Sequence, residues 1–134
     1  MDFRTLNLWA ILVSALSAFV LGGLWYSRIL FEGAWKRANR FGENEPPPPT
    51  AKIFILSFVL SLVMAVNLAM FLNAPGTTVS FGAAAGFAAG FGWAAMGLGI
   101  VALFERRPLS YVLINGGYLT LALTLMGTIL GAWR

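Results

Sequence analysis

The side chains of this 134-residue chain that are suited to binding or catalysis lie beside two charged stretches. Aromatic, cationic, carboxylate and amide side chains occur together there, and the candidates are Trp25, Tyr26, Arg28, Glu105, Arg106, Asn115 and Tyr118. Such a set could hold a ligand or a lipid headgroup through ion pairs and hydrogen bonds. The same residue types also anchor helix ends at a membrane surface, where Trp and Tyr rings and long cationic chains collect. Both interpretations stay open from the residues alone.

The amino-acid composition excludes several kinds of catalytic and metal-binding site. The chain contains no Cys and no His, so thiolate nucleophiles, imidazole bases and the usual zinc, haem and iron–sulfur ligand sets are excluded. No charged residue lies between positions 53 and 104, which disfavours a proton relay inside a membrane. We expect a protein that is not an enzyme and has no catalytic residue, metal or cofactor. An enzyme acting on lipid, with Glu105 as its acid or base, is the disfavoured alternative.

The helices that carry these residues follow from the spacing of charge. Only 10% of the residues are charged and 59% are hydrophobic, whereas soluble domains carry about 25% charge. The uncharged stretches are 5–27, 53–104 and 108–133, and one membrane-spanning helix needs about 20 residues. The turn at Asn73-Ala74-Pro75-Gly76 divides the middle stretch. We therefore predict an all-α fold, a four-helix integral membrane bundle forming one domain over 1–134, with spans of about 6–26, 51–73, 80–104 and 109–133.

The connection between the first two spans has a pattern of its own. Aromatic and basic residues recur at helical spacing, and Glu32 precedes Lys36 by four positions, which supports a helix. This predicts a short interfacial helix over about 29–42. The four prolines at 46–49 then form an extended linker.

Orientation follows from the distribution of Lys and Arg. Seven of them lie in the connections 28–52 and 105–107, and only Arg4 and Arg134 lie on the other side. Because cytoplasmic loops hold the excess of positive charge, we expect a multi-pass protein of the bacterial inner membrane with both termini in the periplasm. Anionic lipid headgroups, and not nucleic acid, are then the expected partner of the basic cytoplasmic face.

Small residues four positions apart indicate how the helices pack. Each predicted span has such a row, and the clearest are Gly82, Gly86 and Gly90 in the third span and Thr120 and Thr124 in the fourth. Small residues let helix backbones approach closely in a membrane. We expect a tightly packed bundle with the glycine-rich span 80–104 at its centre. Contact between two copies of the chain stays open as an alternative.

Three motifs resemble a known family. The chain reads GLWYSRILF at 23–31, FERRPL at 104–109 and INGGY at 114–118. These motifs resemble a bacterial family of small membrane proteins catalogued as a domain of unknown function, over essentially the whole chain. Arg28 stands where that family usually has Pro, and Glu32 where it usually has Gly. The resemblance implies four helices and a membrane location, and it implies no activity.

Two functions follow as hypotheses. The first is a non-enzymatic membrane protein that associates with itself, with a partner protein or with lipid through its basic cytoplasmic face. The alternative is a homo-oligomeric channel or transporter that passes a small neutral or weakly polar solute along Asn67, Thr120, Thr124 and Thr128.

Overall fold

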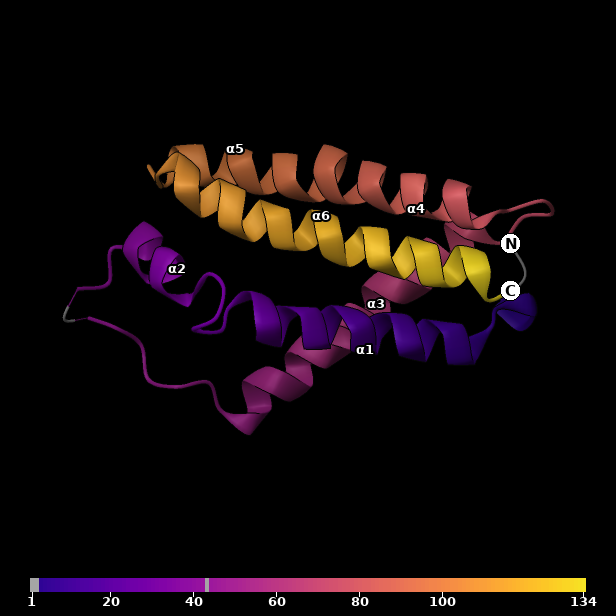
Figure 1. Cartoon of the computed structure of the whole chain (residues 1–134), viewed down its shortest axis with the longest axis horizontal. Coiled ribbons are helices and arrows are strands. Elements are labelled where there is room, and N and C mark those ends of the chain that lie inside the picture. Colours follow the sequence, from indigo (N-terminus) through magenta and orange to yellow (C-terminus); the bar gives the residue numbers. More distant parts are fainter. Residues whose placement is uncertain (1–2, 43) are drawn as a thin grey trace.

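Four long apolar helices dominate the computed structural model, which describes residues 3–42 and 44–134 (Figure 1). They are α1 (Leu8–Trp25), α3 (Ala51–Leu72), the composite helix Val79–Phe104 and α6 (Leu109–Ala132). Each is long and apolar enough to cross a membrane, and its bounds lie within two residues of the predicted ones. The described residues contain no strand. The predicted all-α class with four membrane helices is confirmed.

The third of these helices is not a uniform α-helix. It consists of α4 (Val79–Phe87), a π-helical segment η2 (Ala88–Ala95) and α5 (Met96–Phe104). A π-helix closes its hydrogen bonds one residue further along than an α-helix and is rare. Residue spacing predicted one continuous helix here, so the π-helical segment is a feature that the sequence did not indicate.

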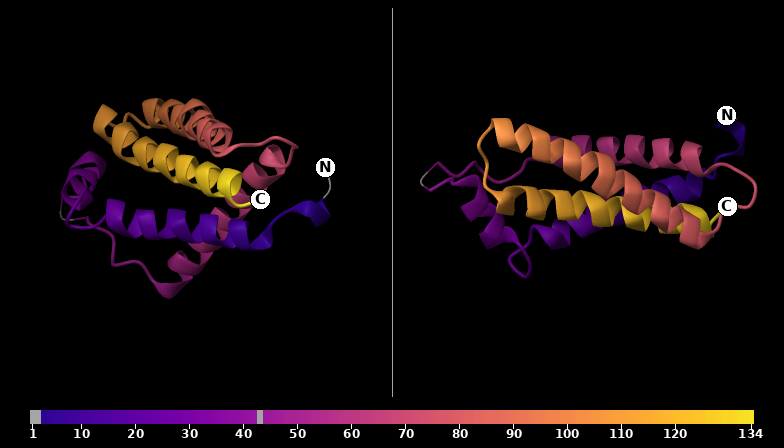
Figure 2. Two further views of the ribbon diagram at one scale, coloured as in Figure 1. Left: turned by 45° about the vertical axis from the view of Figure 1, so that its right-hand side comes forward. Right: turned by 90° about the horizontal axis from the view of Figure 1, so that it is seen from above.

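The centre of the bundle is α6, not the glycine-rich helix that we expected. Helix α6 packs against Val79–Phe104 on one side and against α1 and α3 on the other, as Figure 1 and the left view of Figure 2 show. Buried residues accordingly occur along α6 from Ile114 to Gly131. The glycines Gly82, Gly86 and Gly90 all face α6 alone, while a Cβ atom added to Gly92 or Gly97 would have no neighbouring atom within 4 Å. The glycine-rich helix therefore has one close partner and lies at the edge.

The interface between α4–η2 and α6 is a contact between backbones. A Cβ atom added to Gly90 would lie 2.6 Å from Cα of Thr120, and one added to Gly82 would lie 3.1 Å from Cα of Gly131. Thr120, Thr124 and Thr128 each donate their hydroxyl to the carbonyl four residues earlier in α6. Asn67 lies on the exposed side of α3, so these residues do not form a common solute path within one chain.

Helix α3 crosses the bundle obliquely behind α1 (Figure 1). Its buried residues, Ser61, Ala65, Leu68, Ala69 and Leu72, all lie between the middle of the helix and its C-terminal end. The first half contacts α1 mainly through Phe54 and Phe58, whose rings meet Phe19 edge to face at 6.1 and 6.0 Å. The bundle is thus tightly packed at one end of α3 and open at the other.

Helix α2 (Glu32–Asn39) is shorter than the predicted interfacial helix of 29–42. It begins late because residues 26–31 form a turn in which the amide of Phe31 donates to the carbonyl of Trp25. It ends early because Arg40 has a left-handed backbone, with φ of 55°. Helix α2 lies at the same end of the bundle as the α5–α6 connection, and we call this the basic end (Figure 1). Residues 3–7 and 133–134 lie at the opposite, terminal end.

Candidate functional site

Four of the predicted site residues join the end of α1 to α6. The indole Nε1 of Trp25 donates to the carbonyl of Ile114 at 2.9 Å, and the Tyr26 hydroxyl donates to Oδ1 of Asn115 at 2.7 Å. Further into the bundle, the Tyr118 hydroxyl donates to the carbonyl of Ala18 at 2.9 Å. We call Trp25, Tyr26, Asn115 and Tyr118 the aromatic clamp. The motifs at 23–31 and 114–118 meet because their side chains bond across two adjacent helices.

The polar atoms of the clamp are used within the protein. Asn115 also donates its Nδ2 to the carbonyl of Tyr111 at 3.0 Å. Burial, followed by the neighbouring phenols of Tyr118 and Tyr111, raises the pKa of Tyr26, so its hydroxyl stays protonated and remains a donor. The clamp therefore holds helices together and has few hydrogen-bonding groups left for a ligand.

Aromatic rings extend the clamp to α2. The Trp35 ring lies 6.0 Å from that of Tyr26 and 5.3 Å from that of Phe41, and Phe31 lies 4.6 Å from Trp25. Edge-to-face pairs at such distances add to the stability that burial provides. This ring cluster fixes α2 across the basic end, and it includes Phe31, Trp35 and Phe41, which were not among the predicted site residues.

The predicted residue Arg28 lies outside the clamp. Its side chain is 96% exposed, and its Nε is 3.8 Å from Glu32. Lys36 contacts the carboxylates of both Glu32, at 3.3 Å, and Glu45, at 2.6 Å. Its hydrogen bonds to Glu45 and then to Glu32 raise the pKa of Lys36. The carboxylates around α2 are therefore already neutralised by cations of the same segment.

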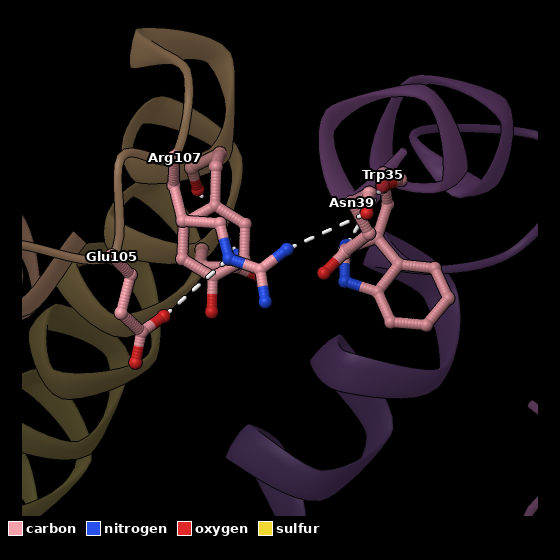
Figure 3. A network of polar contacts seen from close by, with 6 residues as sticks. Trp35, Asn39, Glu105 and Arg107 are labelled. Carbon is pink, nitrogen blue, oxygen red and sulfur yellow. Dashed lines mark hydrogen bonds and ion pairs between the residues drawn. The ribbon is translucent and has the colours of Figure 1, made fainter. Parts of the chain in front are cut away.

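Arg107, which belongs to the same charged stretch as Glu105 and Arg106, links the α5–α6 connection to α2. Its Nε is 3.4 Å from Oε2 of Glu105, and its Nη1 donates to the carbonyl of Asn39 at 3.4 Å. Figure 3 shows the guanidinium between these two residues. Its Cζ also lies 5.3 Å from the centre of the Tyr111 ring, a cation–π contact. A cation at the carbonyl end of α2 is favoured by the helix dipole, and Glu105 has its partner in Arg107.

Two arginines beside this contact have an unusual backbone. Arg40 and Arg106 have φ of 55° and 59°, a conformation that costs a residue with Cβ about 1–2 kcal/mol and that glycine adopts freely. Arg106 is the turning residue after α5, where its amide and that of Arg107 donate to carbonyls of the last turn at 3.1 and 2.9 Å. Glycine is the usual residue at such a position.

We call Arg37, Arg40, Arg106 and Arg107 the basic rim. Arg40 follows Asn39 and Arg106 precedes Arg107, so the Arg107–Asn39 contact brings two arginine-bearing turns together. Of the four, only Arg107 makes an ion pair with a carboxylate in the part of the chain that the structure describes. The rim is thus a local excess of positive charge, and only its member Arg106 was among the predicted site residues.

No group of three potential metal ligands is found among residues 3–42 and 44–134. No curated protein and no solved structure matches the chain. One family model, described as a protein of unknown function (DUF1761), matches residues 9–131. This match covers nearly the whole chain and confirms the resemblance to a family of unknown function. The chain with the aromatic clamp and the basic rim belongs to the DUF1761 family.

Proposed function

We propose that this chain is a non-enzymatic, multi-pass protein of the bacterial inner membrane that binds anionic lipid headgroups through its basic rim. In this proposal the basic end faces the cytoplasm and both termini face the periplasm. The excess of Lys and Arg in the connections at the basic end supports this orientation. Phosphate groups of lipids are natural ligands for guanidinium groups, which bind two phosphate oxygens at once.

The observation that carries the proposal is the unpaired charge of two members of the rim, Arg40 and Arg106. Glu32 and Glu45 are occupied by Lys36, and Glu105 by Arg107. No described carboxylate pairs with Arg40 or Arg106, although both have a backbone that glycine would adopt at lower cost. Arginine at these turns lowers the stability of the fold and adds charge at the membrane surface. A negatively charged ligand at that surface would pair with these two guanidinium groups.

Each arginine of the rim is expected to contribute separately to the affinity for anionic lipid. A Lys or Arg near an anionic membrane surface contributes about 1 kcal/mol to the interaction, which is about fivefold in affinity. Salt screens such charges over about 8 Å at physiological ionic strength. Binding through the rim should therefore weaken as salt is added.

The test compares lipids on the intact chain by native mass spectrometry. We expect phosphatidylglycerol to stay bound in preference to phosphatidylcholine, and we expect Arg106→Gln to weaken phosphatidylglycerol binding about fivefold. Arg106→Gly removes the same charge while relieving the backbone, so a loss of binding in this variant does not come from unfolding. Arg4→Gln is the matched control, because it removes one charge at the terminal end. Equal binding of both lipids, or an equal loss in Arg4→Gln, would contradict the proposal.

A further inference from the structure

An amide side chain lies on the outer side of α3, within the membrane-spanning segment. Asn67 is exposed, and its Nδ2 donates to the carbonyl of Val63 at 3.1 Å. Its Oδ1 and its second N–H have no hydrogen bond to any described residue. Asn67 lies five residues before the end of α3 at Leu72, about 8 Å along the helix axis. At that end of α3, the charged side chain of Arg134 donates to the carbonyls of Leu72 and Ala74 at 2.7 and 2.9 Å. Asn67 therefore lies deeper along the bundle axis than this charged group.

In a single chain, the unpaired polar atoms of the Asn67 amide would face lipid, which costs free energy. Lipid tails offer no hydrogen bonds, so a polar group that faces them needs a partner in protein. Asn side chains in membrane helices find such partners on neighbouring helices. In this chain, α1 and α6 pack on the opposite side of α3 and do not supply one. The unused donor and acceptor of Asn67 therefore point to a helix outside the chain.

The residues around Asn67 form a regular seam. Leu56, Leu60, Val63, Asn67 and Met70 follow one another at alternating steps of four and three residues, the spacing of a coiled coil. Leu56, Leu60 and Val63 are 51%, 65% and 52% exposed. Asn67 lies two residues beyond the buried Ala65, about 200° further around the helix. We call these five residues the α3 seam; its first four members are exposed on the side away from the bundle, and Met70 is half-buried.

We propose that the α3 seam binds the same seam of a second copy, in a parallel homodimer in which the two Asn67 amides hydrogen-bond to each other. Identical chains insert with the same topology, so the two α3 helices run in the same direction and place Asn67 at the same depth. An amide has both a donor and an acceptor, and a twofold axis lets each satisfy the other. A single Asn at such a position of a seam also sets its register and favours a dimer.

The first test is crosslinking of the intact chain in membranes. The chain contains no Cys, so a single introduced Cys reports one position. We expect Val63→Cys to form a disulfide-linked dimer of this chain on oxidation. Leu121→Cys, on an exposed part of α6, is the control and should stay monomeric. The proposal is overturned if Val63→Cys stays monomeric, if it links mainly to another protein, or if Leu121→Cys forms as much dimer.

The second test measures how much the Asn67 amide contributes to dimerisation. Dimerisation is measured by energy transfer between labelled copies as the protein is diluted in phosphatidylcholine bilayers. We expect Asn67→Leu to raise the dissociation constant about tenfold and Asn67→Gln, which keeps the amide, to remain near the wild type. Because Asn67 is exposed, neither change disturbs the fold of the monomer. Unchanged dimerisation in Asn67→Leu, or monomers at every dilution of the wild type, would refute the proposal. Dimerisation should not change in Arg106→Gln, which separates this result from lipid binding.

Discussion

The closest packing in the molecule, between α4–η2 and α6, provides a sharp test of the fold. An added Cβ at Gly86 would overlap the carbonyl oxygen of Leu123, lie 2.8 Å from the carbonyl carbon of Leu123 and lie 3.0 Å from Cα of Thr124. All three are backbone atoms of α6, so no side chain can rotate away. The change Gly86→Ala therefore forces two helices apart.

The size of the effect follows from these distances. Ordinary contact begins at about 3.4 Å, so the carbonyl carbon of Leu123 alone requires the backbones to separate by about 0.6 Å, and its overlapping oxygen requires more. A gap of about 0.5–1 Å removes a quarter to a half of the dispersion energy of each contact along an interface. Overpacking of a dense core costs about 1–3 kcal/mol. We expect Gly86→Ala to lower the free energy of unfolding by about 2–3 kcal/mol, in the upper part of that range, because the atoms that clash belong to the backbone.

The assay is unfolding of the full chain in lipid–detergent bicelles, followed by circular dichroism. The matched control is Gly97→Ala in α5, where an added Cβ has no atom within 4 Å. This control should be as stable as the wild type, or more so, because alanine favours a helix over glycine. A Gly86→Ala variant as stable as the wild type, or a Gly97→Ala variant destabilised to the same extent as Gly86→Ala, would contradict a close backbone contact at Gly86.

Three further predictions concern other parts of the molecule. Ser14→Ala should raise the free energy of unfolding by about 1 kcal/mol, because the buried Ser14 hydroxyl has no partner within the described residues; an unchanged or lower value in the same unfolding assay would contradict this. Tyr26→Phe should lower the free energy of unfolding by about 1 kcal/mol, since it removes the bond to Asn115; stability equal to the wild type would show that the bond contributes nothing. Cysteines introduced at Thr77 and at Glu43, which lies outside the described residues, should react with an impermeant thiol reagent from opposite sides of the membrane, and labelling from one side only would remove a span.

The helix count and the helix ends were predictable because they depend on local features of the chain. The length of an uncharged stretch can be compared directly with the thickness of a bilayer, and Pro75 and Gly76 mark a turn wherever the helices then pack. Helix α2 was predicted too long because its stop is an arginine. Arg40 has a left-handed backbone, and no residue preference predicts that conformation for arginine.

Part of the candidate site was predictable as well. Aromatic and amide residues near the ends of α1 and α6 were expected to lie at one level, and Trp25, Tyr26, Asn115 and Tyr118 do lie together. Arg28 and Arg106 have the same residue type and lie at the same end, but only the contact between Arg107 and Asn39 shows which of them belongs to the rim. Those two residues are 68 positions apart, and the spacing of a sequence carries no signal over such a distance.

The class of the protein, the number of its membrane helices and the rows of small residues by which they pack were all evident in the amino-acid sequence, since composition, charge spacing and helical periodicity are properties of single segments. The packed bundle was needed to show that α6 is the central helix, that the polar atoms of the aromatic clamp are hydrogen-bonded within the protein, and that the side of α3 carrying Asn67 is left uncovered. Each of these depends on which faces of two segments meet. A face that can pack closely, such as that of Gly82, Gly86 and Gly90, looks the same in the sequence whether it has one partner or several.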